Sequence, residues 1–135
     1  METTFWRLTV RSSFSAAHAL RGYQGKCENL HGHNYAVEMN VDGYRLDDDI
    51  EFAVDFSILK RHLNDALEAL DHKNLNELEP FTRMNATAEN LARYLFKKLK
   101  IQLSGLPVEL HSMTVWETEK QGATYFEAAG KPTKL

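Results

Sequence analysis

The sequence predicts one α+β domain covering residues 1–135: a four-stranded antiparallel sheet with two helices on one face, in the order β-β-α-α-β-β. Three observations predict it. Apolar and polar residues alternate toward both ends of the chain, and the apolar period changes to three and four residues in the middle. A short run of turn residues also separates the last two alternating segments.

The first two strands are predicted from alternation in the N-terminal third. Residues 4–18 place apolar side chains at even positions from Trp6 to Val10. Residues 33–44 alternate in the same way, with apolar side chains at odd positions. Each segment is therefore expected to bury one face and to leave the other polar.

Two helices and two further strands follow. From Asp55, apolar residues recur every three or four positions as far as Leu70, which predicts an amphipathic helix of about four turns. A second helix is predicted after the N-cap residue Thr87, and the stretch 70–85 between the helices is predicted to be a polar connection. The last strands are predicted at 108–118 and 123–129, joined by the hairpin residues "EKQG". Four strands leave two open edges, so association into a larger barrel is expected.

Composition excludes several classes of protein. The net charge is −3, the pI is about 6.1, and the basic residues are scattered, which argues against a nucleic-acid-binding module. A single cysteine allows neither an internal disulfide nor a cysteine-rich zinc site. The N-terminal residues show no signal peptide and no membrane span, so the cytoplasm is the expected compartment.

Three histidines are candidate metal ligands. His31 and His33 share one face if they begin the second strand, and Gly32 between them permits close approach of backbone or ligand. His18 closes the first strand, which brings it beside the start of the second in an antiparallel pair. Three neutral imidazoles suit Zn²⁺ and leave a fourth position open for chemistry. The alternative is an ordinary polar start to a strand, which the residues alone leave open.

Further acid–base groups surround this candidate site. Cys27, four residues before His31, would be a competent base as a thiolate near a cation, or else a small buried hydrophobe. In Asp71–His72 the carboxylate could orient the imidazole, although the pair also suits a solvated helix end. Glu117, at the end of an apolar strand, could accept two parallel hydrogen bonds from a guanidine-like ring edge, or lie on the surface before a turn.

Six blocks of the sequence occur together in one known family. They are "FSAAH", "GKCENLHGHNY", "DFSILK", "LDHKNLN", "TAENLARYL" and "VWET", and they extend from Phe14 to Thr118. In these blocks the chain resembles the 6-pyruvoyltetrahydropterin synthase and 6-carboxytetrahydropterin synthase family. The resemblance implies the tunnelling fold, in which subunits form trimeric twelve-stranded barrels that stack into homohexamers.

The resemblance also implies roles for individual residues. It implies one zinc ion per subunit on the three histidines, Cys27 as the general base and a proton relay of Asp71 and His72. It implies that Glu117 anchors the pterin ring. Thr87 and Glu89 match residues near the pterin pocket, which in the family is built between subunits.

The implied substrate is 7,8-dihydroneopterin triphosphate, and the branches of the family differ in the product. The short spacing from Cys27 to His-Gly-His resembles the bacterial branch, which makes 6-carboxy-5,6,7,8-tetrahydropterin, a queuosine precursor, and releases acetaldehyde and triphosphate. The first alternative is the pyruvoyl product. Because Glu28 stands where a variant branch has its catalytic glutamate, the second is 6-hydroxymethyl-7,8-dihydropterin for folate synthesis. A non-enzymatic pterin-binding module is the remaining alternative.

Overall fold

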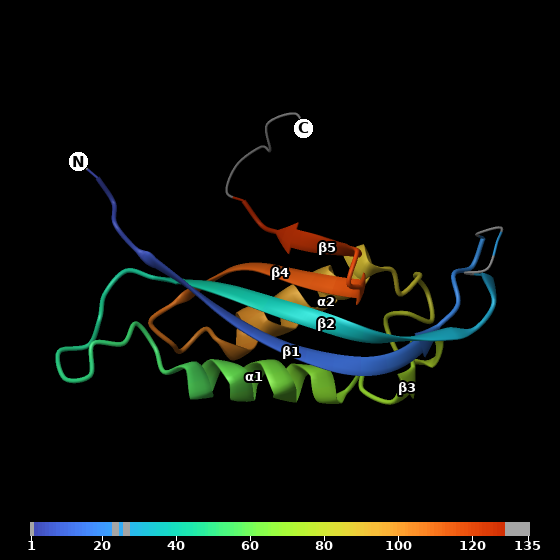
Figure 1. Ribbon diagram of the computed structural model, residues 1–135, viewed down its shortest axis with the longest axis horizontal. Coiled ribbons are helices and arrows are strands. Elements are labelled where there is room, and N and C mark those ends of the chain that lie inside the picture. The colour runs from blue at the N-terminus through green and yellow to red at the C-terminus, as the bar shows by residue number, and fades with distance from the viewer. Residues whose placement is uncertain (1, 23–24, 26–27, 129–135) are drawn as a thin grey trace.

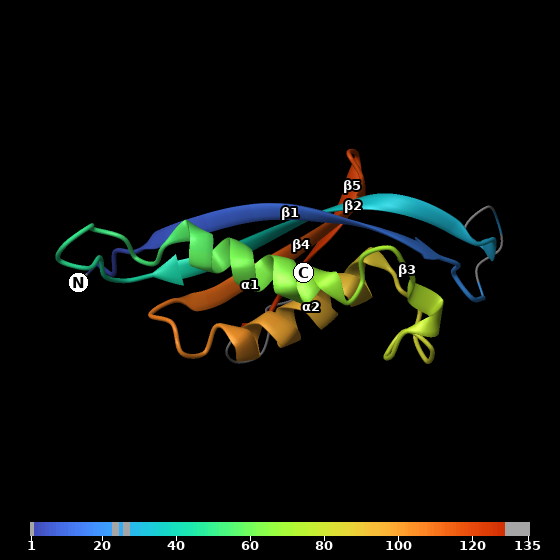
Figure 2. The same ribbon diagram turned by 90° about the horizontal axis from the view of Figure 1, so that it is seen from below.

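Two long antiparallel strands form the centre of the structure, a computed structural model that describes residues 2–22, 25 and 28–128 (Figure 1). The sheet order is β3-β1-β2-β4-β5. Helices α1 and α2 lie side by side on one face of the sheet (Figure 2), so the predicted α+β architecture is confirmed. The elements are β1 (Trp6–His18), β2 (His31–Gly43), α1 (Phe56–Glu68), β3 (Lys73–Asn74), the 3₁₀ helix η2 (Leu75–Glu77), α2 (Ala88–Gln102), β4 (Glu109–Thr118) and β5 (Gln121–Phe126).

The sheet has five strands instead of the predicted four. The additional strand, β3, lies in the predicted polar connection and pairs in parallel with β1 at Ala16 and Ala17. His72 has a positive φ of 58°, which turns the chain so that its backbone N–H donates to the carbonyl of Ser15 at 2.6 Å. A two-residue strand has no periodicity to detect in the sequence.

The final hairpin is tighter than predicted. β5 covers Gln121–Phe126 rather than 123–129, so Glu119 and Lys120 alone form the loop. Gly122 permits this arrangement, because a Cβ there would lie 2.8 Å from the ring of Trp116. The strand therefore starts at residues that the sequence assigned to a turn.

The core lies between the sheet and the two helices. The alternating residues of β2 from Tyr35 to Val41 are fully buried, as are Leu59 and Leu63 of α1 and the leucines of α2. Both helices begin at side-chain caps, of which the sequence predicted Thr87: Asp55 accepts from the N–H of Ser57 at 2.8 Å, and Thr87 accepts from the N–H of Asn90 at 3.1 Å. The predicted periodicities thus fix which face of each element is buried.

Long stretches at both edges of the sheet stay unpaired within the described chain. On its outer side β1 pairs with β3 at two positions, and β5 pairs with β4 alone. Edges of this kind are where strands of another chain can add. Among the described residues, no helix has the length and apolar character needed to cross a bilayer.

Glu127, just after β5, joins this edge to α2. Its carboxylate accepts hydrogen bonds from Lys97 at 2.8 Å, from Lys100 at 3.0 Å and from the hydroxyl of Tyr125 at 2.9 Å. The Lys97 contact, followed by those of Lys100 and Tyr125, lowers the pKa of Glu127 from 4.5 to about 2. The carboxylate therefore contributes stability that depends on pH.

Replacing Glu127 with Gln should reduce the acid sensitivity of the fold. Because the pKa is lower in the folded state, the contribution of this carboxylate is complete above about pH 4.5 and is lost as the pH falls toward 2. The variant should lose less than about 1 kcal/mol at pH 7, since the ion pairs are partly exposed. Its deficit relative to the parent should shrink by pH 3, as measured by urea unfolding. An equal deficit at both pH values would contradict the assignment.

Candidate metal centre and adjoining pocket

The pairing of β1 with β2 brings three histidines together. His18 ends β1 and lies opposite His31, the first residue of β2, and Ala16 lies opposite His33. All three rings project toward the helices, and their nearest nitrogens lie within 4.8 Å of one another. His18 is buried, and the other two are partly buried. The predicted meeting of these side chains at one end of the sheet is confirmed.

The hydrogen bonds of two of these rings determine where their protons lie. Nδ1 of His18 is 2.7 Å from the carbonyl oxygen of Ala86, and Nδ1 of His31 is 2.7 Å from that of Asn29. Because a carbonyl can only accept, each Nδ1 carries the proton and each Nε2 presents a lone pair. The two Nε2 atoms nevertheless lie 2.9 Å apart. When both rings are neutral, two lone pairs at this distance repel, and either a shared metal ion or a proton on one Nε2 relieves the repulsion.

His33 completes the arrangement. Its Nε2 is buried and has no hydrogen-bond partner among the described residues. Burial lowers the pKa of His18 and of His33, which favours the neutral imidazole that binds metals. Three convergent nitrogens, two of them oriented by backbone carbonyls, fit the donor set of a zinc site with an open fourth position.

A carboxylate lies directly beside this centre. Glu117 projects from the helix-facing side of β4, and its Oε2 is 3.7 Å from Nε2 of His33. The same residue lines a pocket of 170 Å³, together with Glu89 of α2 and with Gln121 and Gly122 of β5. The sequence predicted Glu117 and Glu89 but not the two β5 residues, because it assigned them to the hairpin turn.

Thr87, which the sequence predicted both as an N-cap and near the pocket, caps α2 in the structure. Its hydroxyl accepts from the N–H of Asn90 and caps α2, and the residues that line the Glu117 pocket begin with its neighbour Ala88. By capping α2, Thr87 fixes the first turn of the helix, and this turn carries Glu89.

The Asp71–His72 pair lies on the other side of β1. Asp71 accepts the backbone N–H of Ser15 at 2.9 Å and lies 3.0 Å from Nδ1 of His72. These contacts, that of Ser15 first, lower the pKa of Asp71, so the carboxylate is ionised and can orient the imidazole. The side chain of His72 is 81% exposed. The predicted dyad thus exists, at the outer edge of the sheet.

A shallow hollow extends from the dyad across the sheet. It measures 460 Å³, and its lining includes His72 and Lys73 at one end and Gly32 and His33 at the other. Because β1 lies between β3 and β2, the dyad lies on the opposite side of β1 from His31 and His33.

The structure describes only one of the two predicted bases. Glu28 is exposed, and its backbone N–H donates to the carbonyl of Gly25 at 3.2 Å. Cys27 lies outside the described residues.

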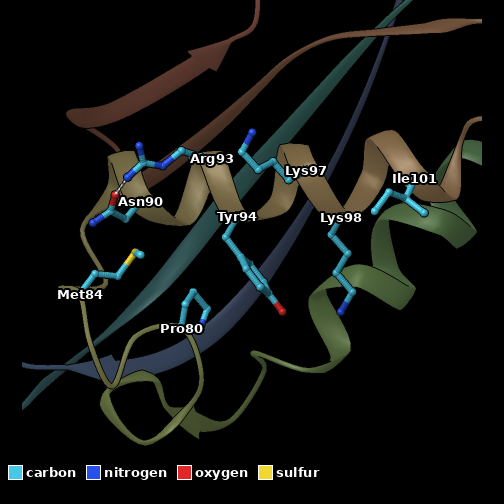
Figure 3. Close-up of a pocket in the computed structure, with 8 residues that line it drawn as sticks. All are labelled: Pro80, Met84, Asn90, Arg93, Tyr94, Lys97, Lys98 and Ile101. Carbon is cyan, nitrogen blue, oxygen red and sulfur yellow. Dashed lines mark hydrogen bonds between the residues drawn. The ribbon is translucent and has the colours of Figure 1, made fainter.

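A separate hollow of 410 Å³ lies on the outer face of α2 (Figure 3). Met84, Tyr94 and Ile101 give it an apolar floor, and three basic side chains surround it. None of the predicted site residues lines this hollow.

Known proteins similar to this chain are named for pterin chemistry. A family model described as "6-pyruvoyl tetrahydropterin synthase" matches residues 7–128. A 6-carboxy-5,6,7,8-tetrahydropterin synthase from Synechocystis is 36% identical over 131 residues, covering 94% of this chain and 98% of the relative. A putative 6-pyruvoyl tetrahydrobiopterin synthase from Caenorhabditis elegans is 36% identical, with coverages of 84% and 89%. A dihydroneopterin monophosphate aldolase from Pyrococcus furiosus is 33% identical, with coverages of 86% and 93%.

The three-dimensional fold agrees with these relatives. The solved structure of Caenorhabditis elegans 6-pyruvoyl tetrahydropterin synthase superposes with a TM-score of 0.82 at 31% identity, covering 95% of this chain and 99% of that one. The fold is therefore the tunnelling fold. On the strength of the matched residues and the shared fold, this chain belongs to the 6-pyruvoyl tetrahydropterin synthase family.

Proposed function

We propose that this protein is a zinc-dependent lyase that converts 7,8-dihydroneopterin triphosphate to 6-carboxy-5,6,7,8-tetrahydropterin, with release of acetaldehyde and triphosphate. One observation carries the proposal: the Nε2 atoms of His18 and His31 present lone pairs to each other at 2.9 Å, beside the unpartnered Nε2 of His33. This arrangement calls for a cation next to the pocket of Glu117. The product is a precursor of queuosine, and the expected compartment is the cytoplasm.

Substrate binding rests on the carboxylate beside the metal centre. Glu117 can accept two parallel N–H bonds from the amino-pyrimidine edge of a pterin, which fixes the ring and directs its side chain toward the histidines. Zinc on His18, His31 and His33 would supply Lewis acidity to the hydroxyl groups of that side chain. The thiolate of Cys27 would remove a proton from the carbon next to the ring, and His72, oriented by Asp71, would return protons.

Two features support a site that neighbouring chains complete. The Glu117 pocket has 170 Å³, below the roughly 300–1,000 Å³ of typical ligand sites, so a substrate with a triphosphate tail needs further walls. The Asp71–His72 dyad lies at the outer edge of β1, next to the stretch before Ser15 where a strand of another copy could pair. A homohexamer built from two barrel-shaped trimers is the proposed assembly.

The choice of product rests on the segment before the metal ligands. The relative from Synechocystis, a named 6-carboxy-5,6,7,8-tetrahydropterin synthase, covers 94% of this chain, and the short spacing from Cys27 to His31 resembles that branch. A second candidate is side-chain cleavage to 6-hydroxymethyl-7,8-dihydropterin. It is favoured by Glu28, three residues before His31, and by the relative from Pyrococcus furiosus named as an aldolase.

Purified protein loaded with zinc should convert dihydroneopterin triphosphate to the carboxy product and an equal amount of acetaldehyde. Removing the metal with a chelator should abolish turnover, and adding zinc back should restore it. Liquid chromatography with mass detection distinguishes the three pterin products. Formation of 6-hydroxymethyl-7,8-dihydropterin alone would replace the proposal with the second candidate. Tight pterin binding without turnover would instead indicate a binding module.

Alanine replacements of Cys27 and Glu28 should separate the two candidate bases. The Cys27→Ala variant should lose a factor of about 10² to 10⁴ in kcat, the usual contribution of a general base. The Glu28→Ala variant should stay within a few-fold of the parent, and both should retain bound zinc because neither is a proposed ligand. Steady-state kinetics and metal analysis provide the measurements. The opposite ranking of the two variants would assign the base to Glu28.

Mixed assemblies should show whether one chain's dyad serves the metal centre of another. Chains carrying His31→Ala and chains carrying His72→Ala should each be inactive alone. Co-expressed in equal amounts, they should recover up to about one quarter of the parental rate, because an intact centre then meets an intact dyad at that frequency. A mixture of His31→Ala with His33→Ala, which damage the same centre, is the matched control. Activity of the first mixture no higher than this control would mean that each chain uses its own dyad.

A further inference from the structure

The three residues that follow His18 are held by side chains rather than by a neighbouring strand. The backbone N–H of Ala19 donates to Oδ1 of Asn76, and the carbonyl of Ala19 accepts from Nδ2 of the same side chain, both at 2.9 Å. Arg21 makes the same pair of contacts with Asn85, again at 2.9 Å each. Each asparagine therefore satisfies both backbone groups of one residue.

This pattern reproduces the pairing of an antiparallel strand. Residues two apart in an extended segment present their N–H and C=O groups to the same side, and a primary amide offers one donor and one acceptor in matching positions. The guanidinium of Arg21 adds contacts of 3.3 Å to the carbonyls of Asn76 and Met84. Ala19 and Arg21 are thus held beyond the end of β1 by hydrogen bonds to both of their backbone groups.

Asn85 is also tied to the element that orients His18. The next residue, Ala86, supplies the carbonyl that accepts from Nδ1 of His18 at 2.7 Å. On its other side, the carbonyl of Asn85 accepts from Nδ2 of Asn90 at 2.9 Å, at the start of α2. Figure 3 shows Asn90 bonded in turn to Arg93. The Ala86 carbonyl therefore lies between Asn85, which is bonded to Arg21, and Asn90 at the start of α2. The direction of this carbonyl fixes the plane of the His18 ring.

Asn76 is held from the opposite side. Its backbone N–H donates to Oδ1 of Asn74 at 3.1 Å, which caps the 3₁₀ helix that follows β3. Because β3 is itself paired with β1 at Ala16 and Ala17, the contact of Asn76 with Ala19 closes a ring of contacts around the end of β1. His18 lies between Ala17 and Ala19, so both of its neighbours in the chain are held by these contacts.

We infer that Asn76 and Asn85 are positioning residues, which hold His18 in the orientation that the metal centre needs and so set its metal affinity. The inference rests on the proposed function, because it assumes that the three histidines bind a metal. Neither asparagine is a ligand: their amides are consumed by Ala19 and Arg21. Residues that orient ligands in this way typically contribute about 10- to 100-fold to metal affinity.

The test compares metal binding by the folded apo-proteins of Asn76→Ala and Asn85→Ala with the parent. Zn²⁺ affinity is measured by competition with a chromophoric chelator, and Co²⁺ is used as a probe because its visible spectrum reports ligand geometry. Each variant should bind Zn²⁺ about tenfold more weakly and should show an altered Co²⁺ spectrum. Asn64→Ala is the matched control: it removes a single contact with Ser12, elsewhere on β1, and should leave both measurements unchanged.

A purely structural role would give a different pattern. It would lower the melting temperature of the apo-protein while leaving the metal affinity and the Co²⁺ spectrum of the folded fraction unchanged. If Asn85→Ala fails to fold, Asn85→Asp retains the acceptor for the Arg21 N–H and loses the donor, and it should still weaken metal binding.

The outcomes separate this inference from the proposed function. Parental affinity and spectrum in all folded variants would overturn the positioning role while leaving the metal centre intact. Absence of metal binding in the parent would overturn the metal centre itself. Weaker binding confined to the Asn76 and Asn85 variants supports the inference.

Discussion

The antiparallel register between β1 and β2 is the constraint on which the site depends. It places His18 opposite His31 and Ala16 opposite His33, and it puts all three imidazoles on the face that the helices cover. A slip of one residue would turn the side chains of one strand to the opposite face. That slip would also move Tyr35 and Met39, both fully buried, out of the core. The hydrophobic core therefore enforces the geometry of the three-histidine cluster.

The arrangement places polar atoms where folding alone would not favour them. Directing the Nε2 lone pairs of His18 and His31 at each other, and burying that of His33, costs free energy unless a cation is present. The carbonyls of Ala86 and Asn29 prevent the first two rings from relieving the conflict by changing tautomer. Apolar burial elsewhere has to offset this cost in the metal-free chain. Metal binding and stability are consequently linked, and the proposed metal should stabilise the native state.

The sequence predicted the elements that depend on periodic burial or on local capping. Leu59 and Leu63 mark the inner face of α1, and Thr87 marks the start of α2, because these signals repeat or act within a few residues. His18 and His31 could be paired because antiparallel strands joined by a loop meet at that loop. The strand β3 is too short for any period, and the carbonyl of Ala86 is chemically the same as every other carbonyl. The contacts of Asn76 and Asn85 span 57 and 64 positions of the chain, so only the folded structure shows which backbone groups they meet.

The position of the Asp71–His72 dyad indicates how assembly and chemistry would be connected. Within one chain, β1 separates the dyad from His31 and His33, and His72 lies beside a sheet edge that is largely unpaired in the described chain. Asp71 is held there by a hydrogen bond from Ser15, a residue of β1 itself, so the dyad is attached to the strand whose edge another copy could join. If that edge pairs with the β5 edge of a neighbour, the same backbone hydrogen bonds that close the barrel also place His72 on the neighbour's side of the junction. Under the proposed function, the strength of these edge contacts then governs catalysis directly, because an isolated subunit would keep its metal centre and lack a correctly placed proton relay.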